Sequence, residues 1–217
     1  MAIALAPTTA AAPAQCQSLG KGAFGYNSTS IWIYATTPPG AYLTVDDSKH
    51  IVASTVPTYE NQTMFEFFSC LHTPAPYQGK GAIDTYQGYI QAPNGECVTL
   101  HDLDNPRTHV ETQPCRFNDV TAIGDVAHAQ HFQFQTDSFY SYYSAVFLGS
   151  THGPVSTNAF GGGGHRIFSL DPAPSSAAGT SYLKSTKVTG DAQSANPSTM
   201  LIGQLGDEYR PPTKSVL

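Results

Sequence analysis

A short stretch in the middle of the chain, Asn94-Gly95-Glu96-Cys97-Val98-Thr99, carries the pattern from which the fold is predicted. A tight glycine turn leads into a short strand, which is typical of a β-hairpin. The same pattern occurs earlier, in Pro39-Gly40-Ala41-Tyr42-Leu43-Thr44. Each stretch is followed later by a strand with alternate aromatic residues, Phe65-Glu66-Phe67 and Phe132-Gln133-Phe134. Because alternate side chains share one face of a strand, both phenylalanine pairs are expected to enter a common core.

These two similar copies, and a fainter third, indicate an internal repeat. The third copy would begin at Ala145–Gly149 and continue through Arg166–Leu170. A repeated unit of this size cannot bury its apolar face alone, so its copies pack on one another. We therefore predict an all-β fold, a β-trefoil of three four-stranded repeats, as a single domain over residues 16–205.

The two ends of the chain are expected to lie outside that domain. Residues 1–15 are rich in alanine and contain Ala12-Pro13-Ala14, which has the small-residue pattern of a cleavage site. We predict that they are the remnant of a signal or pro-segment, with an ordinary flexible N-terminus as the alternative. Residues 206–217 are polar and contain proline, which predicts a flexible tail.

The composition favours strands and turns and argues against two classes of partner. Of the 217 residues, 11% are aromatic and only 12% are charged, and there are 19 glycines and 16 prolines. Aromatic residues suit a pleated sheet, while glycine and proline supply turns. The net charge of −6, without a cluster of lysine and arginine, argues against nucleic acid. No apolar run approaches the roughly 18 residues of a membrane-spanning helix, so no membrane span is expected.

Cysteines and glycosylation motifs both favour an extracellular protein. The chain has four cysteines, an even number, and none forms the C-x-x-C pair of zinc and redox sites. Disulfide bonds are the simpler explanation, and these form in oxidising compartments. Asn27 and Asn61 each begin an N-x-[ST] motif, so both are predicted glycosylation sites. We expect the protein to be secreted, extracellular or part of a cell wall.

The stretch from Gly88 to Gln135 resembles a subdomain of the ricin-B-type lectins. Subdomains of that family have an apolar strand, a glycine turn, a C-L-D motif, a strand that ends in cysteine, and a final N-Q-x-W. The matching segments here are Tyr89–Ala92, Asn94-Gly95, Cys97-Val98-Thr99, Val110–Cys115 and Ala129–Phe132. The resemblance implies a secreted, fungal-like lectin with a β-trefoil fold. It also implies a disulfide between Cys97 and Cys115, and we pair Cys16 with Cys70.

The sequence departs from the family at the sugar site. The carboxylate that holds the sugar in the family lies two residues after the subdomain cysteine, where this chain has threonine. A carboxylate accepts charge-assisted hydrogen bonds from two hydroxyl groups, whereas threonine offers one weaker hydroxyl. Acidic and amide side chains in the adjoining turn could replace it. The predicted ligand-binding residues are Thr99, Asp102, Asp104, Asn105 and Gln130.

Two groups of residues raise the question of a metal ion. His128 and His131 lie three positions apart, with His101 and His109 near in sequence, but positions three apart on a strand face opposite sides. The stretch Asp102–Asn105 offers oxygen ligands, yet it lacks the glycine and glutamate of an EF-hand and suits a solvated turn. We therefore predict structural histidines, no metal and no cofactor.

No hydrolase signature such as G-x-S-x-G or H-E-x-x-H occurs in the chain, so we do not expect an enzyme. The predicted function is non-catalytic carbohydrate binding, with glycans or glycoproteins as partners. One alternative is a β-trefoil protease inhibitor that acts through the loop Phe117–Ala129. Another is a structural protein of a cell surface that self-associates through tyrosine-rich strands such as Phe139–Tyr143. Ligand binding, protease inhibition and assembly without ligand distinguish the three.

Overall fold

The computed structural model describes residues 16–27, 40–55, 61–73, 83–116, 128–137, 142–149, 166–172, 180–187 and 200–205. These residues form strands and one short 3-10 helix, so the expected all-β class is confirmed. The elements are β1 (Gln17–Asn27), β2 (Ala41–Val45), β3 (Ile51–Ala53), β4 (Met64–Thr73), β5 (Ile83–Gln91), β6 (Cys97–Leu100), β7 (Arg107–Gln113), η2 (His128–Gln130), β8 (Phe132–Asp137), β9 (Tyr142–Phe147), β10 (Arg166–Pro172), β11 (Ser181–Lys187) and β12 (Met200–Leu205).

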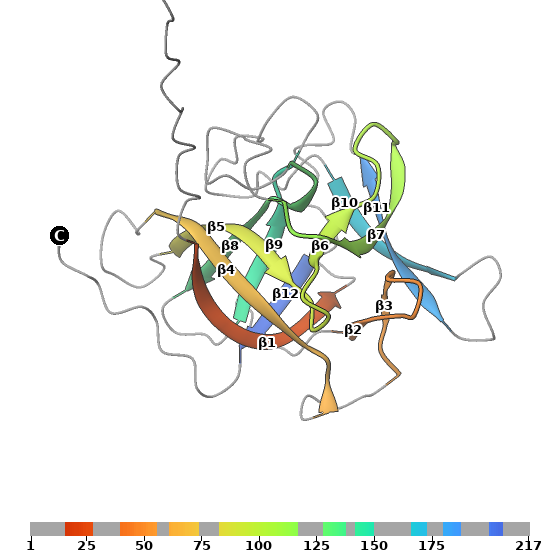
Figure 1. Ribbon diagram of the computed structural model, residues 1–217, viewed down its shortest axis with the longest axis horizontal. Helices are drawn as coiled ribbons and strands as arrows, with labels where there is room; N and C mark the ends of the chain where they lie inside the picture. The colour runs from red at the N-terminus through yellow and green to blue at the C-terminus, as the bar shows by residue number, and fades with distance from the viewer. Residues whose placement is uncertain are drawn as a thin grey trace, which may run out of the picture.

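A closed antiparallel barrel forms the body of the molecule (Figure 1). Strand β1 pairs with β4, β4 with β5, and β5 with β8. The ring continues from β8 to β9 and from β9 to β12, and β12 returns to β1. Closure leaves these strands without a free sheet edge, which removes a common site of aggregation.

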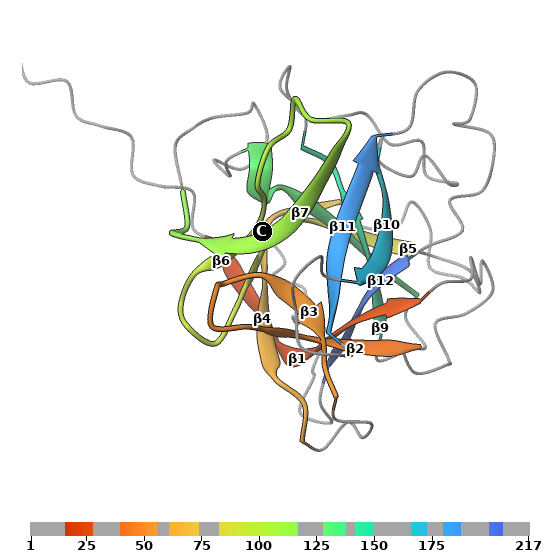
Figure 2. The ribbon, with the colours of Figure 1, turned by 90° about the vertical axis from the view of Figure 1, so that its right-hand side faces the viewer.

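Three hairpins extend from the barrel and meet on one side of it (Figure 2). They are β2–β3, β6–β7 and β10–β11. Strand β11 joins the other two, because it pairs with β7 through Lys184, Ser185 and Thr186 and with β3 through Tyr182. An isolated bridge between His50 and Glu111 links the first two hairpins directly.

Phenylalanine side chains fill the barrel. Both predicted pairs, Phe65 with Phe67 and Phe132 with Phe134, are fully buried in one apolar cluster. The rings of Phe67 and Phe134 meet edge to face with centroids 5.7 Å apart, a favoured aromatic arrangement. The expectation that alternate aromatic residues share a core is therefore confirmed.

The expected β-trefoil of three four-stranded repeats is corrected by the strand pairings. They define one continuous sheet, closed into a barrel, with hairpins that are not equivalent copies. Three residue pairs join β2 to β3, whereas seven join β10 to β11. Within the described residues, β10 pairs only with β11. The repeated sequence pattern predicts hairpin turns, which depend on neighbouring residues. Barrel closure depends instead on contacts between residues far apart in sequence.

Both disulfides have the predicted pairing, Cys16 with Cys70 and Cys97 with Cys115. Two disulfides indicate that the chain folds in an oxidising environment. The predictions for residues 1–15, for 206–217 and for most of the loop Phe117–Ala129 lie outside the described residues. Among the residues that are described, no helix is long and apolar enough to cross a membrane.

Candidate metal-binding site

The turn between β2 and β3 determines where His50 lies. One carboxylate oxygen of Asp46 accepts hydrogen bonds from the backbone N–H groups of Ser48 and His50, at 2.9 and 2.8 Å. The Asp46 N–H donates to the His50 carbonyl and the Lys49 N–H to the Asp46 carbonyl. Lys49 has a φ of 69°, a left-handed conformation that closes this kind of short hairpin. These bonds fix the His50 backbone at the start of β3.

Strand β7 carries the other two residues of the site. Its buried residues alternate with outward-facing ones, so His109 and Glu111 lie two positions apart on the same, partly exposed face. His50 and Glu111 are bridge partners, and the Thr112 N–H donates to the Lys49 carbonyl at 2.8 Å. Register between two hairpins therefore places all three side chains together.

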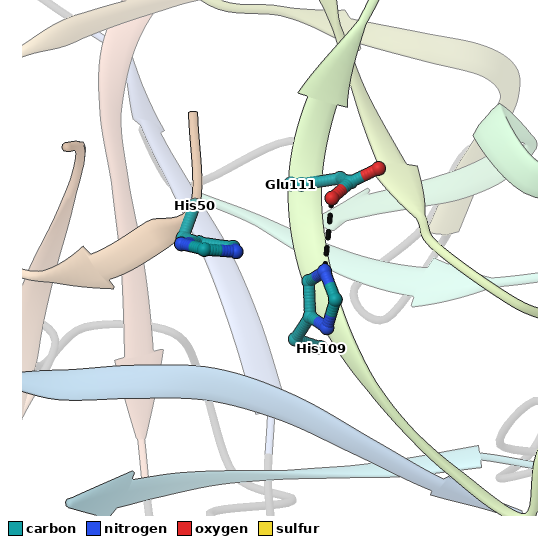
Figure 3. Close-up of side chains that lie close together, drawn as sticks. All are labelled: His50, His109 and Glu111. Carbon is teal, nitrogen blue, oxygen red and sulfur yellow. Dashed lines mark hydrogen bonds and ion pairs between the residues drawn. The ribbon is translucent and has the colours of Figure 1, made fainter. Parts of the chain in front are cut away.

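Figure 3 shows His50 reaching from its hairpin toward His109 and Glu111 on β7. One nitrogen from each histidine and one oxygen of Glu111 all lie within 4.8 Å of one another. The His50 and His109 rings meet edge to face at 4.8 Å, and the Tyr182 ring lies 5.1 Å from His50. Side-chain exposure is 28% for His50, 31% for His109 and 15% for Glu111. The group is thus accessible from solvent but partly enclosed.

Glu111 is the charged centre of this group. Its Oε2 accepts a hydrogen bond from His109 Nε2 at 2.9 Å. Its Oε1 accepts one from His101 Nδ1 at 2.9 Å and one from the Gln113 side-chain amide. Burial alone would raise the pKa of Glu111, but the hydrogen bonds from His101, Gln113 and His109 overcome this and lower the pKa to about 2. The carboxylate is therefore ionised at neutral pH. His101 and His109 must each present a ring N–H to it.

His50 has one ring nitrogen that makes no hydrogen bond within the described part of the chain. Its Nδ1 is buried and has no hydrogen-bond partner among the described residues. Asp46 Oδ2 lies 3.6 Å from this nitrogen, beyond hydrogen-bonding distance. A buried nitrogen without a partner is costly unless it serves a ligand or water.

The structure brings two of the predicted sugar-binding residues together, but inside the protein. Thr99 and Gln130 are each 2% exposed, and Gln130 Nε2 donates to Thr99 Oγ1 at 2.9 Å. The Gln130 amide also contacts the Pro114 carbonyl and the Arg116 N–H. Both side chains are therefore used in internal hydrogen bonds, and those of Gln130 hold the segment after β7.

The other three predicted residues lie on an exposed turn before β7. Asp102 Oδ1 accepts hydrogen bonds from the N–H groups of Asp104 and Asn105, and Asn105 Oδ1 accepts one from the Arg107 N–H. Asp102 and Asn105 therefore shape the turn itself. A ligand-binding role for these residues stays a prediction.

The sequence pattern of His101, His109, His128 and His131 predicts structural histidines and no metal. His128 is close enough to His131 to lower its pKa, but among the described residues neither belongs to a group of three potential metal ligands. The residue that was missed is His50, which comes from another hairpin. One local signal was present, because His109 and Glu111 are two positions apart on a strand. Nothing in the sequence near them points to His50.

Of the two predicted glycosylation sites, only Asn61 has a described side chain, and it is exposed. Thr63, the hydroxyl residue of the same motif, contacts the Thr44 hydroxyl at 2.6 Å. Asn27 ends β1, and the rest of its motif lies outside the described residues. Glycosylation of both stays a prediction.

Comparisons with models of protein families, with curated proteins and with solved structures find no match to this chain. The resemblance to ricin-B-type lectins accordingly stays a prediction, and the case for a function depends on the geometry of the site.

Proposed function

We propose that this protein binds a divalent transition-metal ion, with Zn²⁺ as the best match, through His50, His109 and Glu111. The observation that carries the proposal is the convergence of two imidazoles and one carboxylate within 4.8 Å. Two histidines and a carboxylate are a common donor set for zinc, which leaves a fourth position for water. The disulfides indicate an oxidising environment, and we place the metal-binding protein outside the cell.

The donor atoms need only a small adjustment to hold an ion. Ligand atoms of a tetrahedral zinc site lie about 3.4 Å apart, given zinc–nitrogen distances of about 2.0–2.1 Å. His109 Nε2 and Glu111 Oε2 are now 2.9 Å apart, joined by a hydrogen atom that an ion would replace. The neutral His109 ring can carry its proton on Nδ1 instead, so binding does not require a charged ring. The His50 ring makes no hydrogen bond to the described residues through its buried Nδ1, so none is lost on that nitrogen if the ring turns toward an ion.

A bound ion would add a direct connection between two hairpins. His50 belongs to the β2–β3 hairpin, and the other two ligands belong to β7. The direct links between these hairpins include the His50–Glu111 bridge, the Thr112–Lys49 hydrogen bond and a 2.6 Å ion pair between Lys49 and Glu96. Metal binding is therefore expected to stabilise the hairpin side of the barrel.

The direct test is calorimetric titration of the oxidised, chelator-treated protein with Zn²⁺. One ion is expected to bind to each chain. His50→Ala and His109→Ala should each weaken binding by at least about 100-fold, since losing a ligand costs no less than losing its outer support. His128→Ala is the matched histidine control and should bind like wild type. Absence of zinc binding by the folded wild-type protein would refute the proposal.

A further inference from the structure

We infer that His101 and Gln113 hold Glu111 as a one-oxygen ligand and thereby make the site selective for four-coordinate ions such as Zn²⁺. This inference rests on the proposed metal-binding function. It assigns His101 and Gln113 a positioning role, because they act on the ion only through Glu111.

The two oxygens of Glu111 have different partners. Oε1 receives both outer donors, His101 Nδ1 and the Gln113 amide. Oε2 receives His109 Nε2, which belongs to the converging group. One oxygen is thus fixed on the outer side while the other faces the candidate ion position. Outer hydrogen bonds of this kind orient metal ligands and are a regular part of metal sites.

The fold holds both outer donors in place independently of an ion. Gln113 follows Glu111 by two positions on β7, so both project from the same face. The His101 N–H donates to the His109 carbonyl at 3.2 Å, which places His101 across the hairpin from His109. The two rings stack with centroids 4.5 Å apart and planes 20° from parallel. His101 contacts Glu111 but is not one of the three residues whose ligand atoms converge.

This arrangement opposes chelation by both carboxylate oxygens. Oε1 already accepts two hydrogen bonds, so an ion that takes both oxygens must displace His101 and Gln113. Ca²⁺ takes six to eight oxygen ligands and often binds a carboxylate through both oxygens, whereas zinc sites usually have four ligands. Mn²⁺ likewise favours oxygen-rich, octahedral sites. The two hydrogen bonds to Oε1 therefore favour zinc over ions that need more oxygen ligands.

The experiment compares Zn²⁺ and Mn²⁺ affinities of the full-length oxidised protein and three variants. His101→Ala and Gln113→Ala each remove one donor to Oε1. His101→Asn is the conservative variant, because its amide N–H can replace Nδ1–H. We expect His101→Ala to lose roughly 10- to 100-fold in zinc affinity, with manganese affinity unchanged or higher. His101→Asn should recover most of the loss, and Gln113→Ala should resemble His101→Ala.

Co²⁺ absorption in the visible range gives a readout that a purely structural role would not move. Wild type and His101→Asn should give the intense bands of four-coordinate cobalt, and His101→Ala the weaker bands of higher coordination. If His101→Ala and Gln113→Ala keep the wild-type zinc affinity and cobalt spectrum, the inference is overturned while zinc binding stands. If His101→Asn fails as His101→Ala does, His101 is itself a ligand, and the positioning role is overturned. A wild type that binds neither ion removes the proposed function as well.

Discussion

The molecule has two groups of histidines in opposite environments. His101 and His109, on the β6–β7 hairpin, are partly exposed and share the carboxylate of Glu111. His131, beside η2, is fully buried, and neither ring nitrogen has a hydrogen-bond partner among the described residues. Burial, and then the charge of nearby His128, lower the pKa of His131 to about 4. The comparison shows that histidines form a candidate ligand set where strand pairing places a carboxylate beside them. Closeness in sequence alone does not produce such a set.

The largest expected effect concerns the buried histidine. Because the pKa of His131 is about 4 when folded and near 6.5 when unfolded, only the unfolded chain takes up a proton readily between these values. The stability that neutral His131 preserves is fully present above pH 6.5 and is lost as the pH falls toward 4. The loss amounts to about 3 kcal/mol. His131→Leu should remove this part of the acid sensitivity, as measured by urea unfolding between pH 7 and pH 4.

Replacement of a buried, unpaired imidazole by leucine should also leave stability at pH 7 unchanged or higher, because no hydrogen bond is lost. Equal pH slopes in wild type and His131→Leu would show that His131 is not held neutral by burial. The comparison between the two histidine groups would then lose its electrostatic basis.

A second prediction concerns stabilisation by metal, which only the hairpin histidines should provide. A ligand that binds only the folded state at 100 times its dissociation constant adds about 2.7 kcal/mol to the unfolding free energy. Zinc at that excess should raise the melting temperature of wild type and of His131→Leu equally. It should raise that of His109→Ala far less, because an affinity about 100-fold weaker leaves the ion near its dissociation constant. A zinc-dependent rise that survives His109→Ala but disappears in His131→Leu would reverse the assignment of the two groups.

Much of the local structure could be predicted from the sequence. The alternation of Phe65 with Phe67 and the Asn94-Gly95 turn are local patterns, and the structure has both, with Gly95 at a φ of 81°. The disulfide between Cys97 and Cys115 closes one hairpin and was also predicted. The barrel's closure was not, because β1 meets β12 through residues nearly the whole chain apart.

For the same reason, only part of the candidate site could be predicted from the sequence. His109 and Glu111 share a strand face, which a period of two predicts. His50 joins them through a register between two hairpins, and no spacing within either hairpin encodes that register. The predicted pair of Thr99 and Gln130 did come together, but burial turned it into an internal hydrogen bond. Whether a polar residue faces a ligand or the interior depends on packing that sequence patterns do not fix.

The smallest expected effect is a difference in chemical reactivity that leaves the fold intact. Diethyl pyrocarbonate modifies accessible, neutral imidazole nitrogens. The His101 side chain is 53% exposed and uses only Nδ1 for Glu111, so it should react faster than the other histidines with described side chains, through Nε2. His131 should not react in the folded protein because it is fully buried. Zinc should protect His50 and His109 while His101 stays reactive, since a positioning residue keeps its outer nitrogen free. Peptide mapping by mass spectrometry measures each site, and zinc protection of His101 equal to that of His109 would mean that His101 also binds the ion.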